Sequence, residues 1–107
     1  MTGAKAVVQR KQAAQDAQDV IAYYLGEGSQ QAALGFIDAL EAAYSHIGRR
    51  PATGSTRYAY ELDLPGLRCW SLPRYPYLVF YFERDDHIDV WRVLHGHRDI
   101  PTWMLEN

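Results

Sequence analysis

The 107-residue sequence is 48% hydrophobic and 22% charged with a net charge of -2, which fits one compact domain over residues 1–107. The single cysteine, Cys69, cannot form a disulfide within the chain, no apolar run is long enough to span a membrane, and the N-terminus lacks a signal-peptide pattern. A disulfide scaffold, a membrane protein and a secreted protein are therefore disfavoured, and a cytoplasmic location is expected. The acidic balance also argues against a protein that binds mainly through phosphate contacts.

The first half of the chain predicts a short strand and two helices. Residues 6–8 form an apolar patch typical of a brief strand, and from Gln12 to Gly26 the apolar residues recur at helical spacing. Glycines at 26 and 28 break this pattern, and Ser29 is placed to cap a second helix that begins at Gln30.

The second helix carries one apolar stripe, formed by Ala33, Phe36, Leu40, Tyr44 and Ile47. We expect this helix to end at Gly48 in the left-handed conformation that glycine allows, with Pro51 preventing its continuation. The short link between the two helices predicts an antiparallel helical hairpin. Residues 49–66 read as an extended basic connection that ends in a Pro-Gly turn.

The second half of the chain predicts strands. Candidate strands cover residues 67–72, 77–83 and 88–95, and the last two form a hairpin. The tail over residues 99–106 is apolar enough to dock as a short helix on the sheet. The expected fold is α+β: a short N-terminal strand, then a helical hairpin packed on a small, mainly antiparallel sheet of about four strands, then a short tail.

This element order and four stretches of sequence resemble the RelE/ParE superfamily of bacterial type II toxins. The stretches are residues 32–41 (AALGFIDALE), 66–68 (GLR), 77–82 (YLVFYF) and 88–100 (IDVWRVLHGHRDI). An alternating strand that ends in Arg-Val-Leu-His and is followed by a basic turn and an aspartate resembles the ParE-like branch. The resemblance covers residues 6 to 100.

The resemblance implies a growth inhibitor that a cognate antitoxin holds inactive. ParE-like members poison DNA gyrase and are linked to plasmid stabilisation, whereas RelE-like members cleave messenger RNA on the ribosome. The expected partner is a small antitoxin of the ribbon-helix-helix type, which would form a hetero-oligomer with the toxin and carry any DNA binding. No cofactor is implied.

Two activities therefore remain open. A ribonuclease would need a proton acceptor, a proton donor and cations for the transition state, and His95, His97 and Arg98 are the catalytic candidates for that alternative. The chain, however, contains only two lysines, both before residue 12, and its net charge is negative. This balance favours gyrase inhibition by protein contact, which requires no catalytic residue.

Candidate binding residues follow from the exposed basic and aromatic positions. For the target, the candidates are Arg74, Tyr75, His97 and Arg98. For the antitoxin, the candidates are Arg49, Arg50, Arg57 and Trp103. Tyrosines beside a turn also commonly pack on neighbouring strands, and arginines in a connection are commonly just solvated.

Other conspicuous residues are interpreted as structural. The two histidines at 95 and 97 have a spacing that can chelate a metal, but no further ligand completes a site. A histidine that ends a strand commonly bonds within the turn, and we expect this of His95. Cys69 is interpreted as a small buried hydrophobe rather than a nucleophile paired with His95. Asp99 is expected to cap the tail helix or to pair with Arg98 or Arg92.

Overall fold

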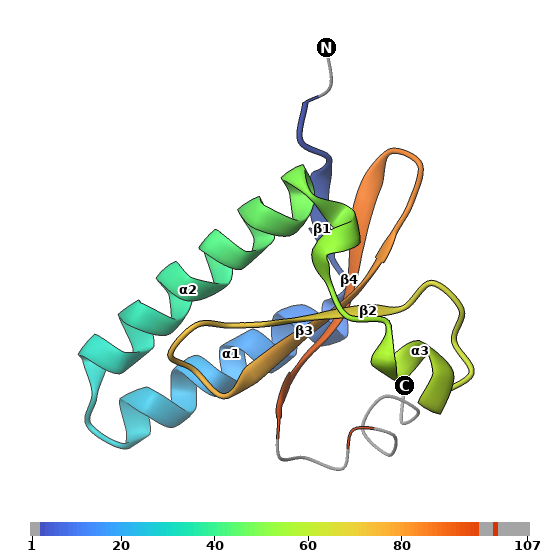
Figure 1. Cartoon of the computed structure of the whole chain (residues 1–107). Helices are drawn as coiled ribbons and strands as arrows, with labels where there is room; N and C mark the ends of the chain where they lie inside the picture. Colours follow the sequence, from blue (N-terminus) through green and yellow to red (C-terminus); the bar gives the residue numbers. More distant parts are fainter. Residues whose placement is uncertain (1–2, 97–99, 101–107) are drawn as a thin grey trace.

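The chain folds into one four-stranded sheet with helices against both faces, described over residues 3–96 and residue 100 by a computed structural model (Figure 1). The elements in chain order are β1 (Ala6–Gln9), α1 (Lys11–Gly26), α2 (Gln30–Arg49), the 3-10 turn η1 (Pro51–Thr53), α3 (Arg57–Glu61), β2 (Arg68–Ser71), β3 (Tyr77–Glu83) and β4 (His87–His95). The α+β class and the helical hairpin are confirmed.

The sheet has the strand order β1-β4-β3-β2 and is mixed. The β2–β3 and β3–β4 pairs are antiparallel, whereas β1 runs parallel to β4 at one edge. Because the whole helical hairpin and two further strands separate β1 from β4 in the chain, this pair can run parallel without a tight turn. The sheet is thus mainly antiparallel, with one parallel edge strand.

The helical hairpin covers one face of the sheet and creates the larger core. Ser29 begins α2 as expected, since its hydroxyl accepts a hydrogen bond from the Ala32 N–H at 3.1 Å. The buried core on this side comprises Ala13, Ala17, Val20, Phe36, Leu40, Ala43, Ile47, Leu72, Tyr77, Val79, Tyr81, Ile88, Val90 and Val93. Among the described helices, none combines the length and apolarity needed to cross a membrane.

The opposite face of the sheet carries a second core under α3. Its buried members are Tyr58, Leu67, Cys69, Phe80, Phe82, Leu94 and Ile100. Ile100 is 2% exposed, so the chain after β4 returns to this face. The rest of the predicted tail helix lies outside the described residues.

The connection over residues 49–66 is not extended as predicted. It contains η1, which Pro51 begins, and α3, in which Tyr58 is buried edge-on against the Phe80 ring. Arg68 holds the connection in place because its Nη1 donates to the carbonyls of Ala52 and Gly54 at 3.1 and 2.8 Å. These contacts are between segments far apart in the chain, so local sequence does not reveal them.

Gly48 does not end α2 in the left-handed conformation, because the helix continues to Arg49. The glycine is needed for a close approach instead. A Cβ at this position would lie 2.8 Å from the Lys5 carbonyl oxygen, just before β1. The Lys5 N–H in turn donates to the Gly48 carbonyl at 2.9 Å, so α2 and β1 meet backbone to backbone.

Cys69 is buried as expected, and burial raises the pKa of its thiol. It does not lie on a strand next to His95, because β3 separates β2 from β4. The sheet therefore places these two side chains on strands that do not pair. Trp70 and Trp91 are half-buried and pack against the first and second cores.

Candidate functional site

The turn between β2 and β3 presents Arg74 at its tip. Arg74 is exposed and has a φ of 69°, a left-handed conformation that residues other than glycine adopt rarely. The neighbouring Tyr75 hydroxyl donates to the Ala32 carbonyl of α2 at 2.9 Å, and its ring packs edge-on against Phe36. The turn is thereby tied to the helical hairpin. Tyr75 acts as the anchor, and Arg74 is the side chain that the turn exposes.

An open cavity of about 470 Å³ lies beside this turn, between α1 and the adjoining ends of β3 and β4. Its lining includes two carboxylates from α1, Asp16 and Asp19, and the imidazole of His95. The half-buried His95 ring lies edge-on to Tyr77, with the ring centroids 5.3 Å apart. The surroundings of His95 are thus aromatic and acidic.

Asp16, which lines this cavity, forms a buried ion pair with Arg92. Arg92 donates from Nε and Nη2 to the two carboxylate oxygens at 2.8 and 2.9 Å, and the Val93 N–H donates to Oδ2 at 3.0 Å. The two side chains are 7% and 3% exposed. Arg92 therefore neutralises an internal carboxylate and is not presented to a ligand.

The three arginines predicted for the antitoxin lie along the connection after α2. Arg49 and Arg50 are exposed at the end of that helix, and Arg49 donates to the Ser45 hydroxyl. Arg57 lies on α3, where its Nε is 3.6 Å from a Glu61 carboxylate oxygen. The first two arginines thus form an exposed basic end of α2, while Arg57 is partly neutralised.

Comparison with known proteins identifies the family. The family model described as "ParE toxin of type II toxin-antitoxin system, parDE" matches residues 7–100. The chain belongs to the ParE toxin family. A solved chain described as "Chromosomal ParDE TA system from P. aeruginosa" has the same fold, with a TM-score of 0.70 and 18% identity over 85% of this chain and 95% of that chain. No curated protein sequence matches.

Four of the residues singled out in the sequence of this ParE-type toxin lie outside the residues that the structure describes: His97, Arg98, Asp99 and Trp103. Within residues 3–96 and 100, no three His, Cys, Asp or Glu side chains gather as metal ligands would. Among the residues predicted to contact the target of this ParE-family toxin, Arg74 and Tyr75 are described, and they lie together in one turn.

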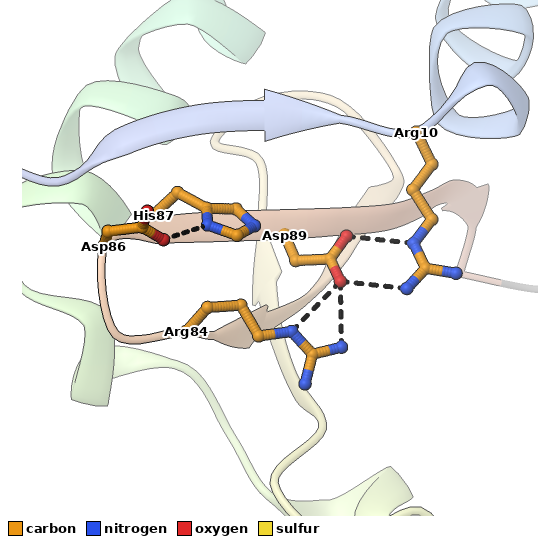
Figure 2. A network of polar contacts seen from close by, with 5 residues as sticks. All are labelled: Arg10, Arg84, Asp86, His87 and Asp89. Atoms are coloured by element: carbon orange, nitrogen blue, oxygen red, sulfur yellow. Dashed lines mark hydrogen bonds and ion pairs between the residues drawn. The ribbon is translucent and has the colours of Figure 1, made fainter.

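A second polar cluster of the toxin, which the sequence does not predict, is formed by Arg10, Asp89 and Arg84, and we call it the arginine clamp (Figure 2). Arg10 donates from Nε and Nη2 to the two Asp89 oxygens, both at 2.9 Å. Arg84 donates from Nε and Nη2 to Oδ2 at 3.1 and 2.9 Å. Arg10 follows β1 and Arg84 follows β3, so the clamp joins the parallel edge strand to the hairpin.

The electrostatics of the clamp follow from this geometry. The hydrogen bonds from Arg10, and then those from Arg84, hold the pKa of Asp89 below its usual range despite burial. The same pairing raises the pKa of Arg10. Asp89 is thus ionised at neutral pH. Asp89 and Arg10 are 79 residues apart in the chain, so no local sequence motif reveals the cluster.

Proposed function

We propose that this ParE-family toxin inhibits DNA gyrase by direct protein contact in the cytoplasm and forms a hetero-oligomer with a small ribbon-helix-helix antitoxin. Family membership supports the antitoxin partner. Any DNA binding by the complex would then belong to the antitoxin.

The observation that carries the choice of target is the acidic cavity at His95. A ribonuclease would need cations near this imidazole to attract RNA and to stabilise the transition state. Here the charges of Asp16 and Arg92 neutralise each other, and Asp19 adds a further carboxylate to the lining. The described lining of this cavity therefore contains no lysine or arginine that could attract a phosphate backbone, which favours inhibition by protein contact over messenger RNA cleavage.

For the target contact we propose Arg74 as the principal described residue, with Tyr75 holding its turn and with His97 and Arg98 as further contacts. An exposed residue kept in a left-handed conformation carries a conformational cost that glycine would avoid. The presence of arginine rather than glycine at this position is consistent with a role for its side chain.

For the antitoxin contact we propose the basic end of α2, Arg49 and Arg50, together with Arg57 and Trp103. Residues 49–57 contain these three arginines and no acidic residue. Such a stretch complements an acidic segment of a partner, and this complementarity favours association.

The test uses purified gyrase in supercoiling and DNA-cleavage assays, run beside a translating extract that reports messenger RNA cleavage. The wild-type toxin is expected to inhibit supercoiling and leave the message intact. Arg74→Gly should fold at least as well, since glycine removes about 1 kcal/mol of left-handed strain. It should nevertheless need about ten-fold more protein for half-inhibition, as loss of a principal contact residue predicts.

Gln31→Ala, which changes an exposed position of α2, is the control and should inhibit like the wild type. Added antitoxin should restore supercoiling, and the double variant Arg49→Gln with Arg50→Gln should require more antitoxin for the same recovery. Cleaved message with unaffected gyrase would overturn the proposal. It would make His95, His97 and Arg98 the first residues to substitute.

A further inference from the structure

The arginine clamp holds more positive charge than its carboxylate balances. Nη2 of Arg10 and Nη2 of Arg84 each lie 2.9 Å from the same oxygen of Asp89. Two guanidinium groups therefore share one carboxylate, and one positive charge is left uncompensated within the clamp. A second anion would complete the balance.

Both arginines keep donors available for such an anion. Their side chains are 50% and 42% exposed, whereas the Asp89 side chain is 10% exposed. Each guanidinium uses Nε and Nη2 on Asp89, and neither Nη1 has an acceptor among the described residues. The clamp can thus donate to a ligand without releasing Asp89.

Aromatic rings hold the two guanidinium groups in place. Cζ of Arg10 lies 4.5 Å from the Trp91 ring centroid, and Cζ of Arg84 lies 4.7 Å from that of Phe82. The two rings also pack edge-on against each other, with centroids 5.0 Å apart. Since the donors are already positioned, a ligand would lose little additional side-chain entropy on binding.

The N-terminus of α1 adds further positive electrostatic potential beside the arginine clamp. Arg10 is the N-cap residue of this 16-residue helix, and no side chain caps its first N–H groups. The helix dipole places partial positive charge at this end, next to the exposed Lys11. These features reinforce the attraction of the clamp for an anion.

The acids near the clamp limit what kind of anion fits. The turn after β3 carries the exposed Asp85 and Asp86, and Asp86 lies 2.6 Å from the His87 ring nitrogen. These acids follow Arg84 directly in the chain, and they would repel the repeated charges of a nucleic acid more strongly than a single carboxylate. The rings of Trp91 and Phe82 lie beside the clamp, so apolar side chains next to that carboxylate in the ligand could pack against them.

We propose that the arginine clamp is a binding site for one carboxylate side chain of an acidic, partly apolar protein segment. The carboxylate would bridge the unused donors of Arg10 and Arg84 on the side away from Asp89. The site does not depend on whether the toxin inhibits gyrase.

The test is a titration of the full-length toxin with two capped peptides, acetyl-Leu-Glu-Leu-amide and its glutamine counterpart, followed by NMR. The glutamate peptide should shift the Nε–H signals of Arg10 and Arg84 and the Trp91 indole signal. The glutamine peptide should bind at least about ten-fold more weakly, because it cannot supply the charge. This comparison needs no variant, so it stays decisive even if a substitution impairs folding.

Arg84→Gln should weaken binding of the glutamate peptide about ten-fold, since Arg10 still pairs with Asp89 but half of the site is lost. Gln18→Glu, on the exposed side of α1, changes the net charge by the same amount away from the clamp and should bind like the wild type. Equal binding of the two peptides, or wild-type binding by Arg84→Gln, would overturn the proposal. Tighter binding of inorganic phosphate than of the glutamate peptide would also overturn it, in favour of a phosphate ligand.

Discussion

At the scale of single residues, the buried pair of Asp16 and Arg92 should be critical for stability. Asp16→Asn would leave the guanidinium of Arg92 unneutralised in a buried site, which typically costs about 3–5 kcal/mol. Urea denaturation monitored by circular dichroism measures the loss. Asp38→Asn, at an exposed position on α2, is the matched control and should change the free energy of unfolding by less than about 0.5 kcal/mol. A loss below about 1 kcal/mol for Asp16→Asn would show that the pair is not effectively buried.

Asp89 should contribute stability that depends on pH. Because Arg10 and Arg84 lower its pKa in the folded protein, its contribution is present above the unfolded pKa and is lost as the pH falls through the folded value. We expect the free energy of unfolding of the wild type to decrease as the pH falls from about 5 into the acidic range, and that of Asp89→Asn to decrease less.

Denaturation curves across that range provide the measurement. Asp85→Asn, exposed on the same hairpin, serves as the control and should retain the pH dependence of the wild type. If the free energy of unfolding of Asp89→Asn depended on pH as strongly as that of the wild type, the arginine clamp would not be the source of the pH dependence.

At the scale of elements, Tyr81 attaches the connection after α2 to the sheet. Its hydroxyl donates to the Pro51 carbonyl at 2.7 Å and accepts from the Gly54 N–H at 3.0 Å. Tyr81→Phe would remove both bonds and leave the buried Gly54 N–H unsatisfied, which should cost about 1–3 kcal/mol. It should also speed proteolysis between residues 50 and 56. Tyr60→Phe is the control, because Tyr60 is 87% exposed, and unchanged proteolysis of Tyr81→Phe would contradict this role.

Elements governed by local chemistry were predictable from the sequence. The run Tyr77–Glu83 is β-prone along its whole length and forms β3 with those bounds, and Ser29 caps α2 as expected. The five-residue α3 was missed because it depends on the burial of Tyr58 against another strand. The role of Gly48 differs from the prediction because its neighbour, the Lys5 carbonyl, is remote in sequence.

The candidate site was less predictable than the fold for the same reason. Arg74 and Tyr75 are adjacent in the chain, so their shared turn was visible as a pattern. Asp16 and Arg92 are separated by 76 residues, and Arg10 and Asp89 by 79, so only the folded sheet brings each pair together. Charge counts over segments of sequence cannot reveal such pairs.

At the scale of the whole molecule, the two cores should unfold together. Alternate residues of β3 enter opposite cores: Val79 and Tyr81 face the helical hairpin, and Phe80 and Phe82 face α3. Neither core can lose this strand alone, so we expect one cooperative transition.

Tryptophan fluorescence can follow each core separately. Trp70 packs against the first core and Trp91 against the second. The variant Trp70→Phe with Trp103→Phe retains only Trp91, and Trp91→Phe with Trp103→Phe retains only Trp70. Within each variant, the fluorescence and circular dichroism transitions should coincide in urea. A fluorescence transition separate from the circular dichroism transition would indicate two independently unfolding halves.

The position of β4 in the sheet has a consequence for synthesis on the ribosome. β4 is the last described strand to be translated, yet it lies between β1 and β3 and carries Arg92. Until it emerges, β1 has no strand to pair with and Asp16 has no cation to neutralise it, so the early helices cannot reach their final packing. A prematurely terminated chain that lacks β4 therefore cannot assemble the toxin fold. The cell would be exposed to activity only from chains translated through this strand.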